Sequence, residues 1–276
     1  MEDQLQAWFG IAGKVAAITG GGGVLCGAMS RGLAKVGVRV AVLDISEAAA
    51  QRVVDDITAQ GGDALAVPCD CLNRDSLAQA RERVLGAFGP VDFLINGAGG
   101  NSPKATTSAN LSFFDLPEEG FRWVFDLNLT TALLTTQVFA RDMVDRGEGA
   151  IVNIASVNSF LPLTNIPAYS AAKAAIRNFT EWLAVHLSQN YATGIRVNAI
   201  APGFYLTEQN RFLLEDPDTG GYTPRGEKVV GKTPMARFGD PDELLGTLVW
   251  LLSPGAAFVH GVTVPVDGGF CAYSGV

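Results

Sequence analysis

The sequence predicts an α/β fold built on a doubly wound parallel sheet of about seven strands. Seven short runs are apolar at successive positions, which is typical of strands covered on both faces. Helix-length stretches lie between these runs, and strands that alternate with helices indicate a parallel sheet. The chain has 276 residues, of which 48% are hydrophobic, so it is long enough to bury a large core.

The predicted elements follow one another from residue 14 to residue 269. Periodic helical patterns cover 46–60, 73–88 and 167–191, and a long helix is expected over 126–143. The predicted strands are 14–19, 39–44, 64–70, 91–97, 150–156, 195–203 and 262–269.

Two segments break this alternation. Residues 97–115 are irregular and follow the fourth predicted strand, and residues 204–232 are polar and rich in turn residues. A segment as long as the second is typical of a lid over a substrate. Because no linker or repeat divides the chain, we expect a single domain over 1–276 with a lid at about 204–232.

The charge distribution argues against several kinds of partner. Acidic residues outnumber basic ones by 28 to 20, the formal charge is −8, and no run of lysine or arginine is present. Nucleic acids and anionic membranes are therefore poor partners. The first residues lack the pattern of a secretory signal, and the longest apolar stretch, 244–252, is far too short for a bilayer span. We expect a cytoplasmic protein.

Cysteine and histidine usage argues against disulfides, metals and hydrolase chemistry. The four cysteines are few and irregularly spaced, so we expect reduced thiols. His186 and His260 are far apart in the sequence, and neither lies near a cysteine pair. No G-x-S-x-G motif occurs. We therefore expect no metal site and no Ser-His-Asp triad.

A glycine-rich turn over 19–27 joins the first predicted strand to a helix. Holding a pyrophosphate requires a tight turn, a close backbone and a helix N-terminus with free N–H groups. Ordinary turns also use glycine, but the position between strand and helix favours nucleotide binding. The glycines of this turn are Gly20, Gly21, Gly22, Gly23 and Gly27.

Asp44 ends the second predicted strand, 24 residues beyond Gly20. An acid about 20 residues after the glycine turn commonly accepts from the adenosine ribose hydroxyls, and it would repel a 2′-phosphate. This position favours NAD(H) over NADP(H). The alternative is that Asp44 caps the next helix, but Ser46 could serve as the cap and leave Asp44 free. Asp70 ends the third strand and could accept from the adenine amino group.

Tyr169 and Lys173 are four residues apart on a predicted helix, so their side chains lie on one face. Ser156 precedes them at the end of a strand. A nearby cation stabilises a phenolate, and lowering the pKa of Tyr169 from about 10 to about 7 requires roughly 4 kcal/mol, which Lys173 together with the nicotinamide charge could supply. Tyr169 would then act as an acid or base at neutral pH. The alternative is a chance pair on the surface.

Taken together, these motifs resemble the short-chain dehydrogenase/reductase family from about residue 14 to residue 269. The resemblance rests on the glycine turn, the Asn-Gly-Ala-Gly stretch at 96–99, Asn128, Ser156, the Tyr169/Lys173 pair and Pro202-Gly203. The spacing of Ser156 and Tyr169, with twelve residues between them, is also similar to the family. It implies a Rossmann-type sheet in the order 3-2-1-4-5-6-7.

The same resemblance implies a role for each matching residue. Tyr169 would be the acid/base, Ser156 would bond the reacting oxygen, Lys173 would bind the nicotinamide ribose, and Asn128 would hold a water that links Lys173 to solvent. The expected NAD-binding residues are Gly20, Gly22, Gly23, Val24, Leu25, Asp44, Asp70, Cys71, Asn96, Ala98, Gly99, Tyr169, Lys173, Pro202, Gly203, Tyr205 and Thr207.

The glycine turn departs from the family pattern at two positions. That pattern reads T-G-x-x-x-G-x-G, whereas this chain has Val24 and Cys26 at the second and third glycine positions. Gly23 and Gly27 are each one residue away, so a shifted turn could bring them into use.

Several longer stretches are similar to the subgroup of D-mannonate oxidoreductases, also called fructuronate reductases. This similarity implies NAD(H)-dependent interconversion of D-fructuronate and D-mannonate. A polyhydroxylated carboxylate requires hydrogen-bonding groups and a cation. Arg211 or Lys104 is the expected carboxylate partner, although both could be solvated loop cations. The expected substrate-binding residues are Asn101, Lys104, Ser156, Asn158 and Arg211. Ser102, Gln209 and Asn210 are further polar candidates.

Other functions remain open at this point. Another carbonyl could be reduced, as in gluconate 5-dehydrogenase-like or 3-oxoacyl-thioester reduction, and the apolar residues Phe204, Phe212, Leu213 and Leu214 would also suit a lipid or steroid. The alternative that is not an enzyme is a non-catalytic NAD sensor.

Members of the family that this chain resembles often form tetramers. We therefore expect a homotetramer that packs through the helices around 126–143 and Trp182.

Overall fold

The computed structural model describes residues 2–207, 211–217 and 220–275, with one seven-stranded sheet at its centre. The strand order is β3-β2-β1-β4-β5-β6-β7, and every neighbouring pair is parallel. This order confirms the Rossmann-type prediction. The strands are β1 Val15–Thr19, β2 Arg39–Asp44, β3 Ala64–Pro68, β4 Phe93–Asn96, β5 Glu148–Ile154, β6 Gly194–Pro202 and β7 Thr263–Val266.

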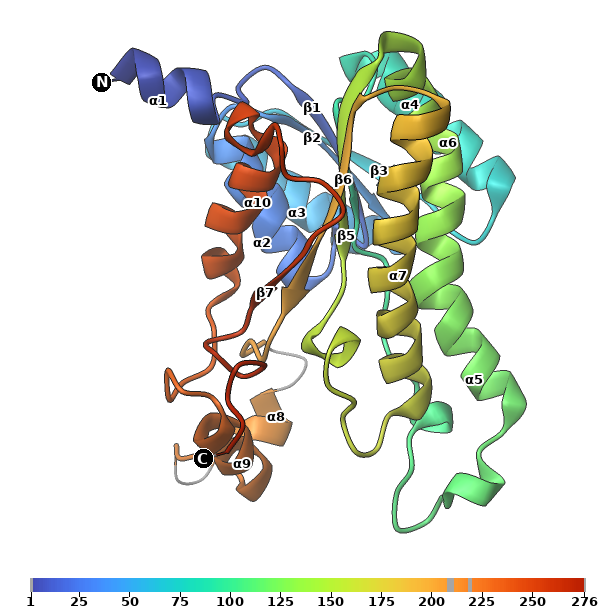
Figure 1. Ribbon diagram of the computed structural model, residues 1–276, viewed down its shortest axis with the longest axis vertical. Coiled ribbons are helices and arrows are strands. Elements are labelled where there is room, and N and C mark those ends of the chain that lie inside the picture. The colour runs from blue at the N-terminus through green and yellow to red at the C-terminus, as the bar shows by residue number, and fades with distance from the viewer. Residues whose placement is uncertain (1, 208–210, 218–219, 276) are drawn as a thin grey trace.

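Helices cover both faces of the sheet (Figure 1), with α2, α3 and α10 on one side and α4, α6 and α7 on the other. Side chains alternate along each strand. Ile18 of β1 therefore packs in the first layer, and the adjacent Ala17 packs in the second. The helices are α1 Glu2–Phe9, α2 Val24–Lys35, α3 Glu47–Ala59, α4 Arg74–Phe88, α5 Glu118–Phe125, α6 Thr131–Arg146, α7 Pro167–Asn190, α8 Arg211–Leu214, α9 Pro224–Lys232 and α10 Leu245–Leu252.

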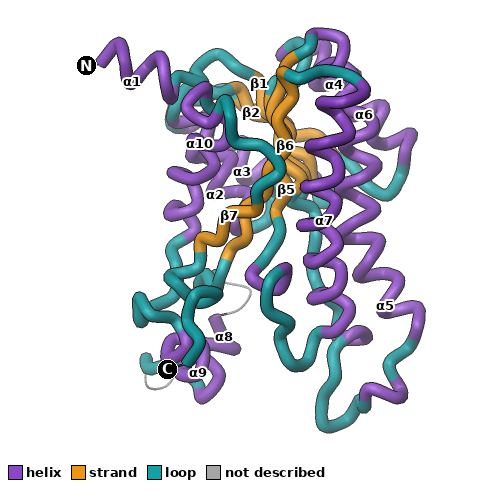
Figure 2. The backbone as a smooth tube through the Cα atoms, viewed as in Figure 1, coloured by secondary structure: helices purple, strands orange, loops and turns teal. Residues whose placement is uncertain are grey.

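Two features of the helices were not predicted. Helix α1 projects from the body of the molecule at the N-terminus. The helix expected over 126–143 is longer at both ends, because α5 and α6 are joined without a break by a π-helical turn, Asp126–Thr130. Figure 2 shows the two helices as one rod along the sheet. Such π turns are frequent at functional sites.

The region predicted as a lid contains two short helices, α8 and α9, which lie close to the C-terminal segment (Figure 1). Thr223 caps α9 by accepting a hydrogen bond from the Gly226 amide at 3.1 Å. Gln209 and Asn210 lie outside the described residues. Both helices stand at the same end of the molecule as the carboxyl end of β6.

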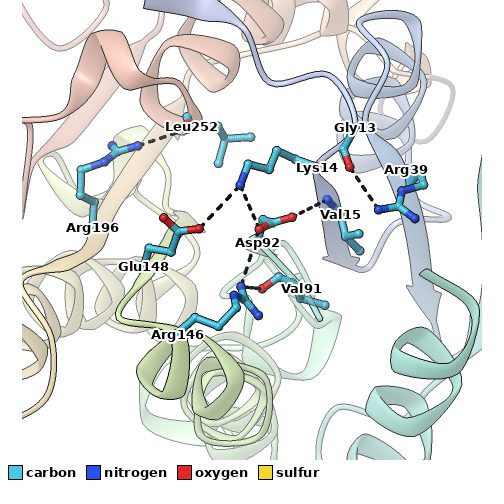
Figure 3. Close-up of polar contacts among 10 residues, drawn as sticks. All are labelled: Gly13, Lys14, Val15, Arg39, Val91, Asp92, Arg146, Glu148, Arg196 and Leu252. Atoms are coloured by element: carbon cyan, nitrogen blue, oxygen red, sulfur yellow. Dashed lines mark hydrogen bonds and ion pairs between the residues drawn. The ribbon is translucent and has the colours of Figure 1, made fainter. Parts of the chain in front are cut away.

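A cluster of charged residues connects the strands at their amino ends, away from the end that carries α8 and α9 (Figure 3). Asp92 precedes β4, and its carboxylate accepts a hydrogen bond from the Val15 amide at 2.9 Å. The same carboxylate pairs with Lys14 at 3.3 Å and with Arg146 at 3.7 Å. Asp92 therefore ties β1, β4 and the end of α6 together.

We expect Asp92→Ala to lower the free energy of unfolding by about 1–3 kcal/mol, because the Val15 amide and two cations lose their shared acceptor. Urea unfolding of the purified variant measures this change. Asp92→Asn is the matched control, since its amide oxygen can still accept from Val15 and the loss should be smaller. Equal midpoints for Asp92→Ala and the parent chain would contradict this role.

Candidate active site

A cleft of about 770 Å³ opens at the carboxyl edge of the sheet. It lies where the strand order reverses between β1 and β4, which is the usual ligand-binding position in doubly wound folds. Its volume falls within the range of about 300–1,000 Å³ that is typical of ligand pockets. Residues that follow β1, β2, β3, β4, β5 and β6 all contribute to its walls.

The glycine turn forms one end of the cleft. Gly20 adopts a left-handed conformation with φ of +63°, and a Cβ there would lie 3.0 Å from the Ala98 backbone. Gly23 is the N-cap of α2, so the free N–H groups and the positive dipole end of this helix point to the cleft. Gly23, Val24 and Leu25 line the cleft as predicted. Gly22 does not, because its position packs against Ala49 of α3.

The structure accounts for Cys26 at a position where the family pattern has glycine. A Cβ at Gly97 would lie 2.2 Å from the Cys26 sulfur. The Cys26 thiol therefore fits because residue 97, directly after β4, is a glycine without a side chain. Of the two glycines expected to take over, Gly23 lines the cleft, whereas Gly27 lies inside α2, where its amide donates to the Gly23 carbonyl at 2.7 Å.

Asp44 lines the cleft at the end of β2, and both of its oxygens already accept backbone hydrogen bonds. One accepts from the Gly22 amide at 3.0 Å and the other from the Ser46 amide at 2.9 Å. Ser46 caps α3 as predicted, but Asp44 is not left free. Each carboxylate oxygen keeps a further lone pair for a ribose hydroxyl. Asp70 also lines the cleft, with Cys71 beside it.

Ser156, Tyr169 and Lys173 meet at the other end of the cleft, and all three line it. Ser156 follows β5, while Tyr169 and Lys173 lie one turn apart on α7. The Lys173 ammonium lies 5.6 Å from the centre of the Tyr169 ring and donates to the Ile154 carbonyl at 2.8 Å. The phenol is also within hydrogen-bond reach of the Ser156 hydroxyl.

Burial shifts the pKa values of Tyr169 and Lys173 in opposite directions. Burial raises the pKa of Tyr169 above its ordinary value, although the hydrogen bond with Ser156 opposes this effect. In the chain alone, desolvation of the phenolate outweighs the stabilising contacts. The expected fall toward neutrality also depends on the nicotinamide charge, so it stays a prediction for the complex. Burial lowers the pKa of Lys173 to about 8. At neutral pH the phenol is thus protonated and suited to donate a proton.

Asn158 does not reach the cleft wall; it lies buried behind Ser156. Its backbone amide and its side-chain amide both donate to the Ser156 oxygen, each at 3.2 Å. The Asn158 carbonyl oxygen in turn accepts from the Ser170 hydroxyl at 2.8 Å. Because the Ser156 oxygen accepts these two hydrogen bonds, its hydroxyl proton remains available for a hydrogen bond to another acceptor in the cleft.

Asn128 lies in the π turn between α5 and α6, against the segment that follows β4. Its side-chain amide donates to the Gly100 and Val124 carbonyls at 2.7 Å each. A Cβ at Gly99 would lie 2.7 Å from the Asn128 oxygen and 3.3 Å from the Lys173 ammonium. Asn128 therefore lies beside Lys173 but does not itself line the cleft.

Several other predicted residues lie elsewhere. Asn96 is buried in the core and donates to Thr136 at 3.0 Å and Asn153 at 2.8 Å, so it does not line the cleft. Asn101 donates to Thr106 at 2.9 Å. Ser102 caps the short helix that contains Lys104.

The two residues predicted to bind the substrate carboxylate are paired with acids instead. The Lys104 ammonium lies 3.5 Å from the Glu119 carboxylate, and Arg211 pairs with Glu215. Among the described residues that line the cleft, Lys173 is the one cation.

The remaining predicted cofactor residues do line the cleft: Ala98, Gly99, Pro202, Gly203, Tyr205 and Thr207.

One wall of the cleft was not predicted from the sequence. Trp123, Leu127 and Thr131 form it, four residues apart along the rod of α5 and α6. This spacing is the available signal, but a helix predicted to begin at residue 126 left Trp123 out.

Within the described part of the chain, no helix is long and apolar enough to cross a membrane. Across the same residues, no group of three or more histidines, cysteines or acids is placed to hold a metal ion.

Comparison with known proteins identifies the family. The model of the short chain dehydrogenases matches residues 14–218. An uncharacterized oxidoreductase of Bacillus subtilis is 53% identical over 275 residues, which cover 96% of this chain and 98% of the relative. The 5-keto-D-gluconate 5-reductase of Escherichia coli K12 is 33% identical, with 95% and 96% covered. The chain therefore belongs to the short-chain dehydrogenase family and is an oxidoreductase, as its motifs predicted.

A solved structure is also similar along the whole chain. It is a Haemophilus influenzae protein, provisionally named a D-mannonate oxidoreductase, with bound NAD. The two chains are 48% identical and superimpose with a TM-score of 0.90, and the match covers 96% of this chain and 98% of the other.

Proposed function

We propose that this protein is an NAD(H)-dependent oxidoreductase that interconverts a ketone and a secondary alcohol on a sugar acid, with D-fructuronate and D-mannonate as the pair. The observation that carries the proposal is the convergence of Ser156, Tyr169 and Lys173 at one end of a dinucleotide-sized cleft. The similarity to a D-mannonate oxidoreductase with bound NAD supports the choice of substrate and cofactor.

The cleft fits NAD(H) along its length. The N-terminus of α2 would hold the pyrophosphate, because its amides are free and Gly20 lets the backbone approach closely. Asp44 would bind the adenosine ribose and Asp70 the adenine amino group. Lys173 would bind the nicotinamide ribose, and Gly203 and Thr207 would lie at the nicotinamide end. NAD(H) supplies or accepts a hydride when it is bound.

The chain's own residues would handle the proton and the developing charge. In reduction, Tyr169 donates its phenolic proton to the oxygen that becomes an alkoxide. Ser156 donates a second hydrogen bond to the same oxygen, so stabilisation increases as negative charge develops. Lys173 places a positive charge beside the phenolate that remains. Asn128 would position the water that returns a proton toward Lys173.

Residues 204–232 would form the lid over the substrate. The Arg211 amide donates to the carbonyl of Thr207 at 2.9 Å, and Thr207 lines the cleft. We infer that Arg211 exchanges Glu215 for the substrate carboxylate, since an exposed ion pair costs little to break. Lys104 is the second candidate for this contact.

Assembly as a homotetramer would use the exposed aromatic faces of α5 and α7. Phe121 and Phe125 stack on α5, and Trp182 stacks on Phe179 and His186 on α7. Light scattering on the purified protein measures this assembly.

The function is tested by mixing purified protein with NADH and a panel of ketones while the absorbance of the reduced nicotinamide is followed. We expect oxidation of NADH with D-fructuronate and a much slower reaction with NADPH. A reaction with 5-keto-D-gluconate or a 3-oxoacyl thioester alone would overturn the substrate assignment. Tight NADH binding without turnover on any ketone would indicate a sensor instead of an enzyme.

A further inference from the structure

Two cysteines stand side by side at the adenine end of the cleft. The Cys69 amide donates to the Asp44 carbonyl at 2.9 Å, which continues the ladder of β3, so the chain is still extended there. The chain turns directly afterwards, where the Asn73 amide donates to the Asp70 carbonyl at 3.0 Å. Cys69 and Cys71, on either side of Asp70, both line the cleft and are buried, with exposures of 3% and 7%.

Each thiol shifts the pKa of the other. Interaction with Cys71 lowers the pKa of the Cys69 thiol, and Ser76 acts in the same direction, although burial opposes both. Interaction with Cys69, followed by burial, raises the pKa of the Cys71 thiol. Cys69 is therefore the better nucleophile, and Cys71 is placed to resolve an oxidised Cys69.

We propose that Cys69 and Cys71 form a modification site at which a hydroperoxide converts the thiol pair into a disulfide that weakens dinucleotide binding. This inference rests on the proposed function, because it assigns regulation to the same cleft.

The chemistry is a two-electron oxidation of the thiol pair. The Cys69 thiolate attacks the peroxide, the O–O bond breaks, and an alcohol leaves while Cys69 becomes a sulfenic acid. The Cys71 sulfur then attacks the Cys69 sulfur, the S–O bond breaks, and water leaves with the Cys71 proton. Two thiols and one hydroperoxide thus give one disulfide, one alcohol and one water.

The disulfide would act on binding through Asp70, which lies between the two cysteines. The Asp70 amide donates to the Ser76 hydroxyl oxygen at 3.0 Å, and the Asp70 carboxylate accepts from the Leu72 amide at 2.9 Å. A disulfide requires the two sulfurs to approach to about 2.05 Å. Drawing them together turns the intervening backbone and moves the Asp70 carboxylate from the place where it would meet adenine.

The test treats the full chain with hydrogen peroxide and measures intact mass and NADH affinity by nicotinamide fluorescence. We expect a loss of two hydrogen atoms, a peptide that links Cys69 to Cys71, and an NADH affinity at least about tenfold weaker, which is a change of about 1.4 kcal/mol. A thiol reductant should restore both. Adenosine diphosphate ribose, which covers the adenine end, should slow the oxidation.

Variants separate the pair from the other thiols. In Cys71→Ser the reaction should stop at a sulfenic acid on Cys69, and in Cys69→Ser the peroxide should leave the NADH affinity of that variant unchanged. Cys271→Ser, outside the cleft, should respond as the parent chain does. An unchanged mass, or a disulfide that leaves NADH affinity unaltered, would overturn the proposal. If the reduced protein does not bind NADH, the proposed function fails, whereas the mass still reports whether the disulfide forms.

Discussion

Tyr169→Phe is expected to lower kcat for ketone reduction by about 10²–10⁴-fold, the usual contribution of a general acid. The phenylalanine ring fills the same space on α7 but carries no proton for the developing alkoxide. NADH affinity should change little, because the cofactor contacts along the glycine turn and Asp44 are untouched. Steady-state kinetics together with fluorescence titration of NADH separates the two effects.

Tyr191→Phe is the matched control. This residue follows the same helix but is exposed far from the trio, so its loss should leave kcat unchanged. Near-normal turnover in Tyr169→Phe would remove the phenol from the mechanism. Because burial raises the pKa of Tyr169, the protonated form predominates at neutral pH. Alcohol oxidation, which requires the phenolate, should therefore accelerate as the pH rises above neutrality.

The sheet and the ends of its strands could be predicted from the sequence because burial on both faces leaves a continuous apolar pattern. That pattern also placed Asp44, Asp70 and Ser156 correctly, since each follows a strand and the carboxyl ends of parallel strands share one edge. Tyr169 and Lys173 were predictable for a similar reason: helical geometry alone puts them on one face.

The direction of a polar side chain could not be predicted in the same way. Asn96 and Asn158 were both predicted to line the site, yet the first turns into the core and the second supports Ser156 from behind. For Asn96 the direction depends on partners far away in the sequence, Thr136 and Asn153. For Asn158 and Arg211 the partners are closer in the chain, but several polar groups compete for each side chain, and the sequence does not say that Ser156 and Glu215 are the ones it meets.

The pKa of Tyr169 shows why a local pattern is insufficient for electrostatics. The spacing of Tyr169 and Lys173 suggested a stabilised phenolate, but burial of both groups dominates in the folded chain. Burial disfavours the charged form of each group, so it raises one pKa and lowers the other. The full effect of the lysine on the phenol would require the nicotinamide charge as well.

Lys173→Met is expected to abolish ketone reduction and at the same time to stabilise the fold at pH 7. Burial lowers the pKa of Lys173 to about 8, against an ordinary value of 10.5. This difference corresponds to about 3 kcal/mol of destabilisation when the folded chain carries the charge. Removing the ammonium also leaves the Ile154 carbonyl without its donor, which costs about 1–3 kcal/mol. We expect a net gain of about 1 kcal/mol in the free energy of unfolding.

The pH dependence distinguishes this explanation from a simple gain in packing. The cost of the buried charge is fully present below pH 8, and it declines as the pH rises from about 8 toward 10.5, because the folded chain releases its proton before the unfolded chain does. Urea unfolding at pH 7 and at pH 10 should therefore show the advantage of Lys173→Met shrinking or reversing. Lys173→Arg is the matched control, since a guanidinium keeps its charge at both pH values and gains no such relief. An advantage of Lys173→Met that is equal at both pH values would contradict the cost assigned to the charge, and reduction at the parental rate would remove Lys173 from the mechanism.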